Sequence, residues 1–238
     1  FPQYETRQEA GDGASDLFGD ESGSTPSILI GSSFSGVKDF NFEGALAQHT
    51  GLEIANYAIS AGMLFNAMIS YVSSPQFETD MPPFLFWETP GNYDFSDSTS
   101  SQFRQIIPAI YGQCDGKREI AKGTFNVVNG KGGVLLDIPK EKHVEGSNYY
   151  VFLSSTNRGI ANFMMQFDYD DGDGEWFKMD RAQHFNNTGR FFIELSDEIQ
   201  SNLTRISIDG MQPLNTDLTI QLCRLPQTKE TLTTKGTN

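Results

Sequence analysis

The sequence predicts two domains of different fold class, an α/β domain with a parallel sheet and then an all-β antiparallel sandwich. Up to about residue 110, short apolar runs alternate with helical stretches, which is typical of a parallel sheet covered on both faces. After Cys114 the hydrophobic period changes to two, as in strands that bury one face. The 238 residues are enough for two domains that each bury a core.

The first domain is expected to span residues 1–113. Residues 1–26 are acidic and rich in Gly and Ser, and we interpret them mostly as loop. Strands are expected at 28–30, 53–59 and 83–88, and helices at 42–51, 62–74 and 96–110. Such a set makes only part of a doubly wound domain, so we expect the N-terminal part of that domain to lie outside this chain.

The second domain is expected to span residues 114–226, followed by a flexible tail at 227–238. Segments with period-two hydrophobicity are separated by Gly, Asn and Asp turns, which is the pattern of an antiparallel sandwich. The expected strands are 148–155, 161–169, 175–180, 190–195, 203–211 and 218–225.

Charge is strongly negative and unevenly distributed. The formal net charge is −14, and of the 17 Lys and Arg residues only Arg7, Lys38 and Arg104 precede Cys114. This balance argues against nucleic-acid binding, and a polyanion would need a local basic strip in the second half of the chain. No apolar run approaches the roughly 20 residues of a membrane helix, so no membrane insertion is expected.

The two cysteines, Cys114 and Cys223, fit neither a zinc motif nor a redox Cys-x-x-Cys. We interpret them as a disulfide that closes the second domain at its two ends, and two unrelated buried thiols are the alternative. A structural disulfide would imply an oxidising compartment. No cofactor is predicted.

The segment DYDDGDGEW, residues 168–176, resembles a calcium loop at first sight. Read from Asp168, the fifth loop position is Gly172 and the twelfth is Met179, so the ligand register of such a loop fails. An Asp-Gly turn between two strands explains the same residues, and no metal site is predicted.

The loop after the first strand carries the candidate nucleophile, Ser33. A strand that ends in Gly-x-Ser and leads into a helix places a hydroxyl and backbone N–H groups where ligands bind in parallel sheets. The hydrolase elbow Gly-x-Ser-x-Gly fails by one residue, because its fifth position is Ser35. The residues alone leave a nucleophile and a structural serine-rich turn as alternatives.

Other residues are expected to line the cleft beside Ser33. The Ser33 N–H and the loop ending at Gly62 would supply oxyanion donors, although Gly62 also fits an ordinary strand-to-helix turn. Glu88, Asn92 and Tyr93 follow the third strand and are expected at the same cleft, whereas Trp87 is expected in the core.

Two blocks of the first domain resemble the AlgX/AlgJ family, whose SGNH hydrolase-like members O-acetylate alginate in the bacterial periplasm. They are GSSFSGVKDFNFEGALAQHTGLEIANYAISAG and FLFWETPGNYDF. The first corresponds to the family's serine block and implies that Ser33 accepts the acetyl group, and FWETP corresponds to its Trp-Glu-x-Pro block. AlgX is closer than AlgJ, because AlgX carries a C-terminal β-sandwich carbohydrate-binding module closed by a disulfide. Cys114 and Cys223 stand where that disulfide would be.

The sequence departs from the family in one respect. The family's base and its orienting acid form an Asp-x-His motif upstream of the serine, and this sequence contains no Asp-x-His. His49, His143 and His184 are not expected to act as the base. A serine without an adjacent base is a poor nucleophile, so the chain alone is expected to be catalytically incomplete, with the N-terminal half absent or on a separate chain.

A cation-plus-aromatic set in the second domain is the candidate carbohydrate site. It consists of Trp176, Lys178, Arg181 and His184, with Arg158 and Arg190 as extensions. A chain of uronate sugars needs an aromatic ring to pack on and cations for its carboxylates. A half-buried strand with one solvated face is the alternative.

The expected function is an alginate O-acetyltransferase that works through a serine acyl-enzyme in the periplasm of a Gram-negative bacterium. The expected partners are the anionic polysaccharide, an unidentified acetyl donor and other exopolysaccharide-export proteins. A periplasmic esterase or deacetylase that uses the same serine is the second candidate, because transfer to water or to sugar differs by solvent exclusion. A non-catalytic polysaccharide-binding scaffold is the third.

Overall fold

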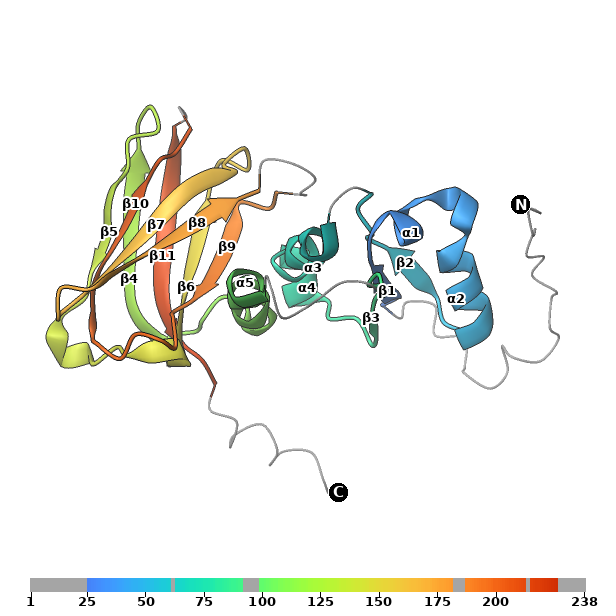
Figure 1. Cartoon of the computed structure of the whole chain (residues 1–238), viewed down its shortest axis with the longest axis horizontal. Helices are drawn as coiled ribbons and strands as arrows, with labels where there is room; N and C mark the ends of the chain where they lie inside the picture. Colours follow the sequence, from blue (N-terminus) through green and yellow to red (C-terminus); the bar gives the residue numbers. More distant parts are fainter. Residues whose placement is uncertain (1–24, 61–62, 92–98, 182–186, 213–214, 227–238) are drawn as a thin grey trace, which may run out of the picture. The chain divides into compact units, whose positions relative to one another are not determined.

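The computed structural model describes residues 25–60, 63–91, 99–181, 187–212 and 215–226. The chain divides into two compact units (Figure 1). Of the described residues, the α/β unit holds 25–60, 63–71 and 75–91, and the sandwich unit holds 72–74, 99–181, 187–212 and 215–226. Gly62, Asn92, Tyr93 and His184, all predicted site residues, lie outside the described residues, as does the expected tail at 227–238.

The α/β unit is built on a three-stranded parallel sheet in the order β2-β1-β3. Its strands are β1 (Ser27–Ile30), β2 (Ile54–Asn56) and β3 (Leu85–Trp87). The four residues of β1, in the middle of the sheet, are all buried, as expected for an apolar strand covered on both faces. The parallel sheet predicted from the sequence is therefore confirmed.

Helices cover both faces of this sheet, with α2 on one side and α3 with α4 on the other (Figure 1). They are α1 (Ser33–Gly36), the 3-10 turn η1 (Lys38–Phe40), α2 (Phe42–Thr50), α3 (Met63–Val72) and α4 (Pro75–Thr79). Phe65 of α3 meets the edge of Trp87 with ring centroids 5.7 Å apart, but Trp87 is half-buried and is not one of the buried core residues, among which it was expected. Helix α2 ends at Gly51, whose φ of 70° favours glycine.

The sandwich unit has two four-stranded antiparallel sheets, in the orders β4-β11-β6-β9 and β5-β10-β7-β8. Their strands are β4 (Glu119–Val127), β5 (Gly133–Asp137), β6 (Tyr149–Ser155), β7 (Asn162–Tyr169), β8 (Gly174–Asp180), β9 (Arg190–Glu194), β10 (Leu203–Asp209) and β11 (Thr216–Arg224). Strand β7 shows why they form: Phe163, Met165, Phe167 and Tyr169 are buried, and the residues between them are half-exposed. One apolar cluster draws on both sheets, which confirms the predicted antiparallel sandwich.

Two strands and one boundary differ from the prediction. β4 and β5 were not predicted, because β4 contains Lys122 and Gly123 within a weak alternation. Gly123 brings the two strands close, since a Cβ there would lie 2.7 Å from the Leu135 carbonyl oxygen. Helix α5 (Thr99–Tyr111), assigned from the sequence to the first domain, belongs to the sandwich unit. It packs on β9, where Arg104 Nε donates to the Glu194 carbonyl oxygen at 2.8 Å.

A disulfide joins Cys114 and Cys223, with their Cα atoms 5.8 Å apart. It links the segment after α5 to β11, so the pairing expected from the sequence is present and both bonded residues lie in the sandwich unit. Among the described residues, no helix has the length and apolarity needed to cross a membrane.

Candidate functional site

Ser33 lies at the carboxyl end of β1, as the first residue of the short helix α1. Ser32 caps this helix, and its hydroxyl accepts a hydrogen bond from Phe34 N at 3.3 Å. The side chain of Ser33 is half-buried, so it lies at the surface of the turn rather than in the core. The turn therefore presents Ser33 at the edge of the sheet where ligands of parallel sheets bind.

Glu88 holds this turn from the neighbouring strand. It follows β3 directly, and its Oε2 accepts hydrogen bonds from Ser32 N at 2.8 Å, Ser32 Oγ at 2.9 Å and Ser35 Oγ at 3.1 Å. Bonds to a charged carboxylate are stronger than bonds between neutral groups. Glu88 faces the serine turn, as its place at a strand end suggested, and these bonds join it to the two serines that flank Ser33.

Gly31 is required for the close approach of Glu88 to the turn. A Cβ at Gly31 would lie 2.6 Å from Glu88 Oε2 and 2.7 Å from Ser35 Oγ, well inside van der Waals contact. Any side chain at this position would push the carboxylate away from the serines. The Gly-Ser-Ser sequence is thus explained by packing as well as by chemistry.

No base for Ser33 is found among the described residues. Within that part of the chain the Ser33 hydroxyl makes no hydrogen bond. His49 is exposed in the last turn of α2, and His143 follows the turn η2 (Lys140–Lys142) of the sandwich unit. That neither of these histidines activates Ser33 stays a prediction.

Asn56 was not singled out from the sequence, yet it fixes the other side of the turn. Its Nδ2 donates to the Ser35 carbonyl oxygen at 2.8 Å, and its Oδ1 accepts from Ala58 N at 2.9 Å. The available signal was its position, because an amide side chain at the carboxyl end of β2 falls on the same sheet edge as Ser33.

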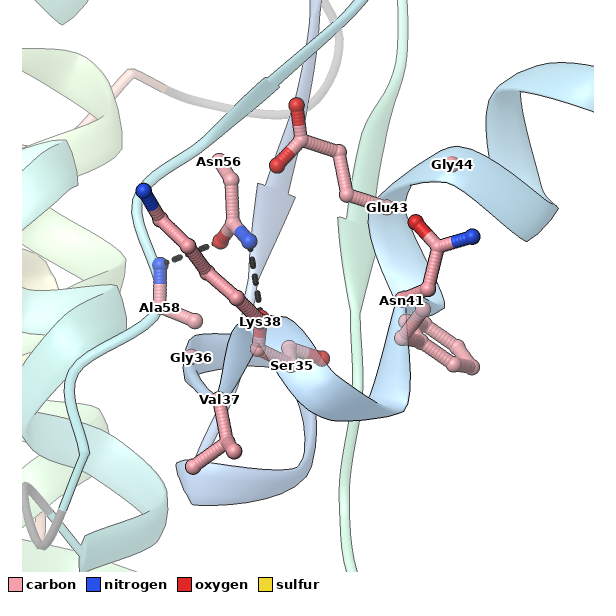
Figure 2. Close-up of a pocket in the computed structure, with 10 residues that line it drawn as sticks. Ser35, Gly36, Val37, Lys38, Asn41, Glu43, Gly44, Asn56 and Ala58 are labelled. Carbon is pink, nitrogen blue, oxygen red and sulfur yellow. Dashed lines mark hydrogen bonds between the residues drawn. The ribbon is translucent and has the colours of Figure 1, made fainter. Parts of the chain in front are cut away.

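A cavity of about 550 Å³ lies beside this turn (Figure 2). Its lining residues come from the end of α1, the start of α2 and the end of β2. They are Ser35, Gly36, Val37, Lys38, Asn41, Phe42, Glu43, Gly44, Asn56 and Ala58.

Phe34, next to Ser33, stacks on Phe40 with centroids 5.8 Å apart, and more than half of each side chain is exposed.

On the sandwich, Trp176 is 54% exposed on β8. It pairs across the sheet with Gln166, which pairs in turn with Ser207 of β10. A groove of about 320 Å³ follows this row and is lined by Gly132, Gly133, Val134, Gln166, Trp176, Ser207, Ile208 and Asp209. Lys178 is exposed on the same strand, and its Nζ lies 3.4 Å from Asp180 Oδ2. Trp176 and Lys178 thus share one outward face.

Arg181 does not belong to this face, which corrects the prediction. It is only 3% exposed, its guanidinium lies 4.6 Å from the Phe191 ring centroid, and Nη1 donates to the Arg190 carbonyl oxygen. Burial lowers the pKa of Arg181, because desolvation disfavours the charged form. The arginine packs the sandwich instead of meeting a sugar.

The two suggested extensions also lie elsewhere. The Arg190 guanidinium packs over the adjacent rings of Phe152 and Phe192, at 5.1 Å and 5.7 Å from their centroids. Arg158 is exposed in the turn after β6. The described cation-plus-aromatic set therefore reduces to Trp176 and Lys178.

The acidic segment at 168–176 forms the turn of the β7–β8 hairpin, as predicted. Asp171 accepts hydrogen bonds from Ser201 Oγ and from Asp173 N. The Ser201 hydrogen bond in particular lowers the pKa of the Asp171 carboxyl. These carboxylates organise their own turn.

The chain is similar to known proteins in sequence and in fold. The family model described as the SGNH hydrolase-like domain of acetyltransferase AlgX matches residues 1–91, which include Ser33 and Glu88. Among solved structures, AlgX of Pseudomonas aeruginosa matches with a TM-score of 0.76 at 22% identity, covering 85% of this chain and 50% of that one. At this identity the structural match speaks for the fold alone.

Curated relatives extend the match beyond the first domain. The alginate biosynthesis protein AlgX of Pseudomonas fluorescens is 30% identical over 209 residues, which cover 87% of this chain and 42% of the relative. The probable alginate O-acetylase AlgJ of the same species is 39% identical over 77 residues, 32% of this chain and 19% of the relative. The chain thus spans less than half the length of the curated AlgX relatives it matches.

Proposed function

This chain belongs to the AlgX/AlgJ family, and from that membership we propose that it supplies the acetyl-accepting serine and a polymer-binding module of an alginate O-acetyltransferase. The single observation that carries the proposal is the Ser33 turn. The serine stands at the carboxyl end of the central strand, and Glu88 and Asn56 fix the turn from the two neighbouring strands.

In this proposal Ser33 Oγ attacks the acetyl carbonyl of the donor, the bond from the acetyl carbon to the donor's leaving group breaks, and Ser33 carries an acetyl ester. A sugar hydroxyl then attacks this ester, the bond between the acetyl carbon and Ser33 Oγ breaks, and a proton returns to Oγ. The Ser33 N–H, which has no acceptor among the described residues, is aimed at the oxyanion that develops in both steps. The proton acceptor is the Asp-x-His pair of the family, which this sequence does not contain. The chain by itself is therefore expected to turn over very slowly.

The outward face of β8 is proposed to hold the polymer. Trp176 offers an exposed ring for packing against sugars, and Lys178 offers a cation for their carboxylates. The groove beside Trp176 adds polar groups from Gln166, Ser207 and Asp209. Such a mixture of one aromatic surface and several hydrogen-bonding groups suits a carbohydrate.

The disulfide supports an oxidising compartment, and together with the family it favours the periplasm of a Gram-negative bacterium. The proposed partners are alginate, an acetyl donor that the sequence does not identify, and other proteins of exopolysaccharide export.

A two-step assay tests the proposed function. The chain is first treated with an activated acetyl ester and imidazole, which stands in for the missing base, and mannuronate oligomers are then added. We expect O-acetylated sugars that depend on Ser33, so Ser33→Ala should abolish transfer and leave polymer binding intact. Release of acetate without polymer would indicate an esterase, and polymer binding with neither product would indicate a scaffold. Turnover without imidazole would reveal a base within the chain.

A further inference from the structure

The cavity beside the Ser33 turn has the place and size of a ligand subsite. Ser35 and Gly36, in the same short helix as Ser33, form one wall, and Asn56 at the end of β2 forms another (Figure 2). The carboxyl edge of a parallel sheet is where ligands bind in such folds. The volume of about 550 Å³ lies within the roughly 300 to 1,000 Å³ usual for small-molecule sites.

The charge distribution singles out Lys38 in this cavity. In the described part of the α/β unit, residues 25–60, 63–71 and 75–91, Lys38 is the one Lys or Arg, against six Asp and Glu residues. Its side chain is exposed and makes no ion pair with a described residue. Among the described residues of the unit, Lys38 is therefore the one lysine or arginine that an anion at this sheet edge can pair with, and it lines the cavity.

Two charged side chains lie on either side of the end of β2. Figure 2 shows the Glu43 carboxylate on one side of Asn56, and the Lys38 side chain running past Asn56 to place its ammonium near Ala58 on the other. Asn56 is held in place by its two backbone hydrogen bonds, so it forms a fixed floor between them. A ligand here meets an ammonium on one side and a carboxylate on the other.

We propose that this cavity is a subsite for one hexuronate residue of the polymer. Its carboxylate pairs with Lys38, and one of its ring hydroxyls donates a hydrogen bond to Glu43. The inference rests on the proposed function of Ser33 and adds the residues that recognise the acceptor polymer. One cation beside one anion suits a sugar with a single carboxylate and neutral hydroxyls. A dianionic phosphate would have one cation to pair with and would be repelled by Glu43.

The arrangement also sets the direction of the sugar. Glu43 repels a carboxylate and accepts hydrogen bonds, so the hexuronate is oriented with its charge toward Lys38. In this inference the sugar bound here is the neighbour of the one whose hydroxyl faces Ser33, since Ser35 and Gly36 of the same short helix line the cavity. Binding of the hexuronate in the cavity would position the hydroxyl of the adjoining sugar at Ser33, and it would favour uronate polymers over neutral ones.

Lysine footprinting tests the inference on the whole chain. Reductive methylation of the lysines is followed by peptide mass spectrometry with and without mannuronate oligomers, in a Trp176→Ala background that weakens binding at the sandwich. We expect mannuronate oligomers to slow methylation of Lys38 several-fold and to leave Lys142 unchanged. Lys142 is the matched control, because it is also exposed. Neutral β-1,4-mannan oligomers of equal length should not protect Lys38.

Substitutions provide the second readout. Lys38→Gln should weaken binding of mannuronate oligomers in this background by about three- to tenfold at low ionic strength, whereas Lys38→Arg should retain it. The control Lys142→Gln should have no effect. Because Lys38 is exposed, its variants should melt at the same temperature as the parent, which a thermal scan checks.

The outcomes separate this inference from the proposed function. One outcome is that mannuronate binds and is acetylated from Ser33, while Lys38 is methylated at the same rate with and without it. In that case the cavity is not the uronate subsite and the role of Ser33 stands. Equal protection by neutral mannan would overturn carboxylate recognition. If the wild-type chain neither binds mannuronate nor transfers acetyl to it, the inference and the proposed function both fail.

Discussion

The two units of the chain bury their strands to very different extents. In the sandwich, five consecutive residues of β6 and three of β9 are buried, and a single apolar cluster spans both sheets. In the α/β unit only β1 is fully buried, β2 and β3 have no buried residue, and neither has α2. The difference teaches that the sandwich closes its core between two sheets, whereas the described α/β unit buries one strand together with apolar residues of α3 and is tied at its strand ends by polar bonds.

The candidate chemistry lies in the unit with less burial. Ser33 and the exposed Phe34 lie in the short helix α1 and Lys38 lies in the turn η1, and no apolar residue of these two elements is buried. Regions of this kind open more readily than closely packed strands, and they also carry binding groups more often. The hydrogen bonds of Glu88 and Asn56 therefore matter more here than similar bonds would in the sandwich.

Removal of the disulfide is expected to give the largest effect, and only in the sandwich. Cys114→Ala with Cys223→Ala should lower the free energy of unfolding of this unit by about 4 to 5 kcal/mol. The disulfide joins residues 109 positions apart, and without it the unfolded chain has more conformational entropy. Denaturant unfolding followed by hydrogen exchange would show the loss at β11 and not at β1. An equal loss in both units would contradict their independence.

Glu88→Gln should affect the α/β unit alone. Glutamine keeps one acceptor oxygen but places an N–H₂ group against serine donors, so the turn should lose about 1 to 2 kcal/mol. Hydrogen exchange at Ser32 N–H should accelerate while the sandwich amides stay unchanged. Glu53→Gln is the control, because Glu53 is exposed. Unaltered exchange at Ser32 would show that the carboxylate does not hold the turn.

Each of two substitutions on the sandwich face should weaken the free energy of polymer binding by about 1 kcal/mol, and the two effects should depend differently on salt. Trp176→Ala should weaken binding of mannuronate oligomers equally at low and high salt, since ring packing is not screened. Lys178→Ala should weaken it mainly at low ionic strength. Calorimetric titration at two salt concentrations measures both. If Trp176→Ala binds like the wild type, the polymer lies elsewhere on the chain.

The smallest expected effect concerns pH. Burial, with a contribution from Asp197, raises the pKa of Glu194 at the end of β9, and Arg104 opposes the shift. The folded state then binds more protons than the unfolded state above the usual pKa of 4.5, so stability falls as pH rises through the raised pKa. Glu194→Gln removes this penalty. Its melting temperature should exceed that of the wild type at pH 7 and match it well below pH 4.5.

Much of the fold was predictable because its strands carry strong patterns. The apolar run of β1 predicts a strand buried on both faces, and the alternation of β7 predicts a strand buried on one face. β4 was missed because Lys122 and Gly123 interrupt its alternation, and Gly123 is explained only by the nearby carbonyl of Leu135. Helix α5 was placed in the wrong unit, because its partner on β9 is far away in sequence.

The candidate site was predictable in its residue types but not in its contacts. The place of Ser33 and of Glu88 followed from their positions at strand ends. The bonds of Glu88 to Ser32 and Ser35 depend on the register between β1 and β3, which the sequence does not state. Arg181 was misplaced because a cation next to an aromatic strand looks the same whether it faces solvent or packs on Phe191.

Peptide mapping of the acetylated chain tests the central claim, that Ser33 carries the acetyl group, most directly. After treatment with an activated acetyl ester and imidazole, the account predicts one hydroxylamine-labile acetyl ester on Ser33, its absence in Ser33→Ala, and an unchanged yield in the exposed control Ser60→Ala. Ester acetylation spread over several serines with Ser33 unmodified, or labelling of Ser33→Ala equal to that of the wild type, would contradict it.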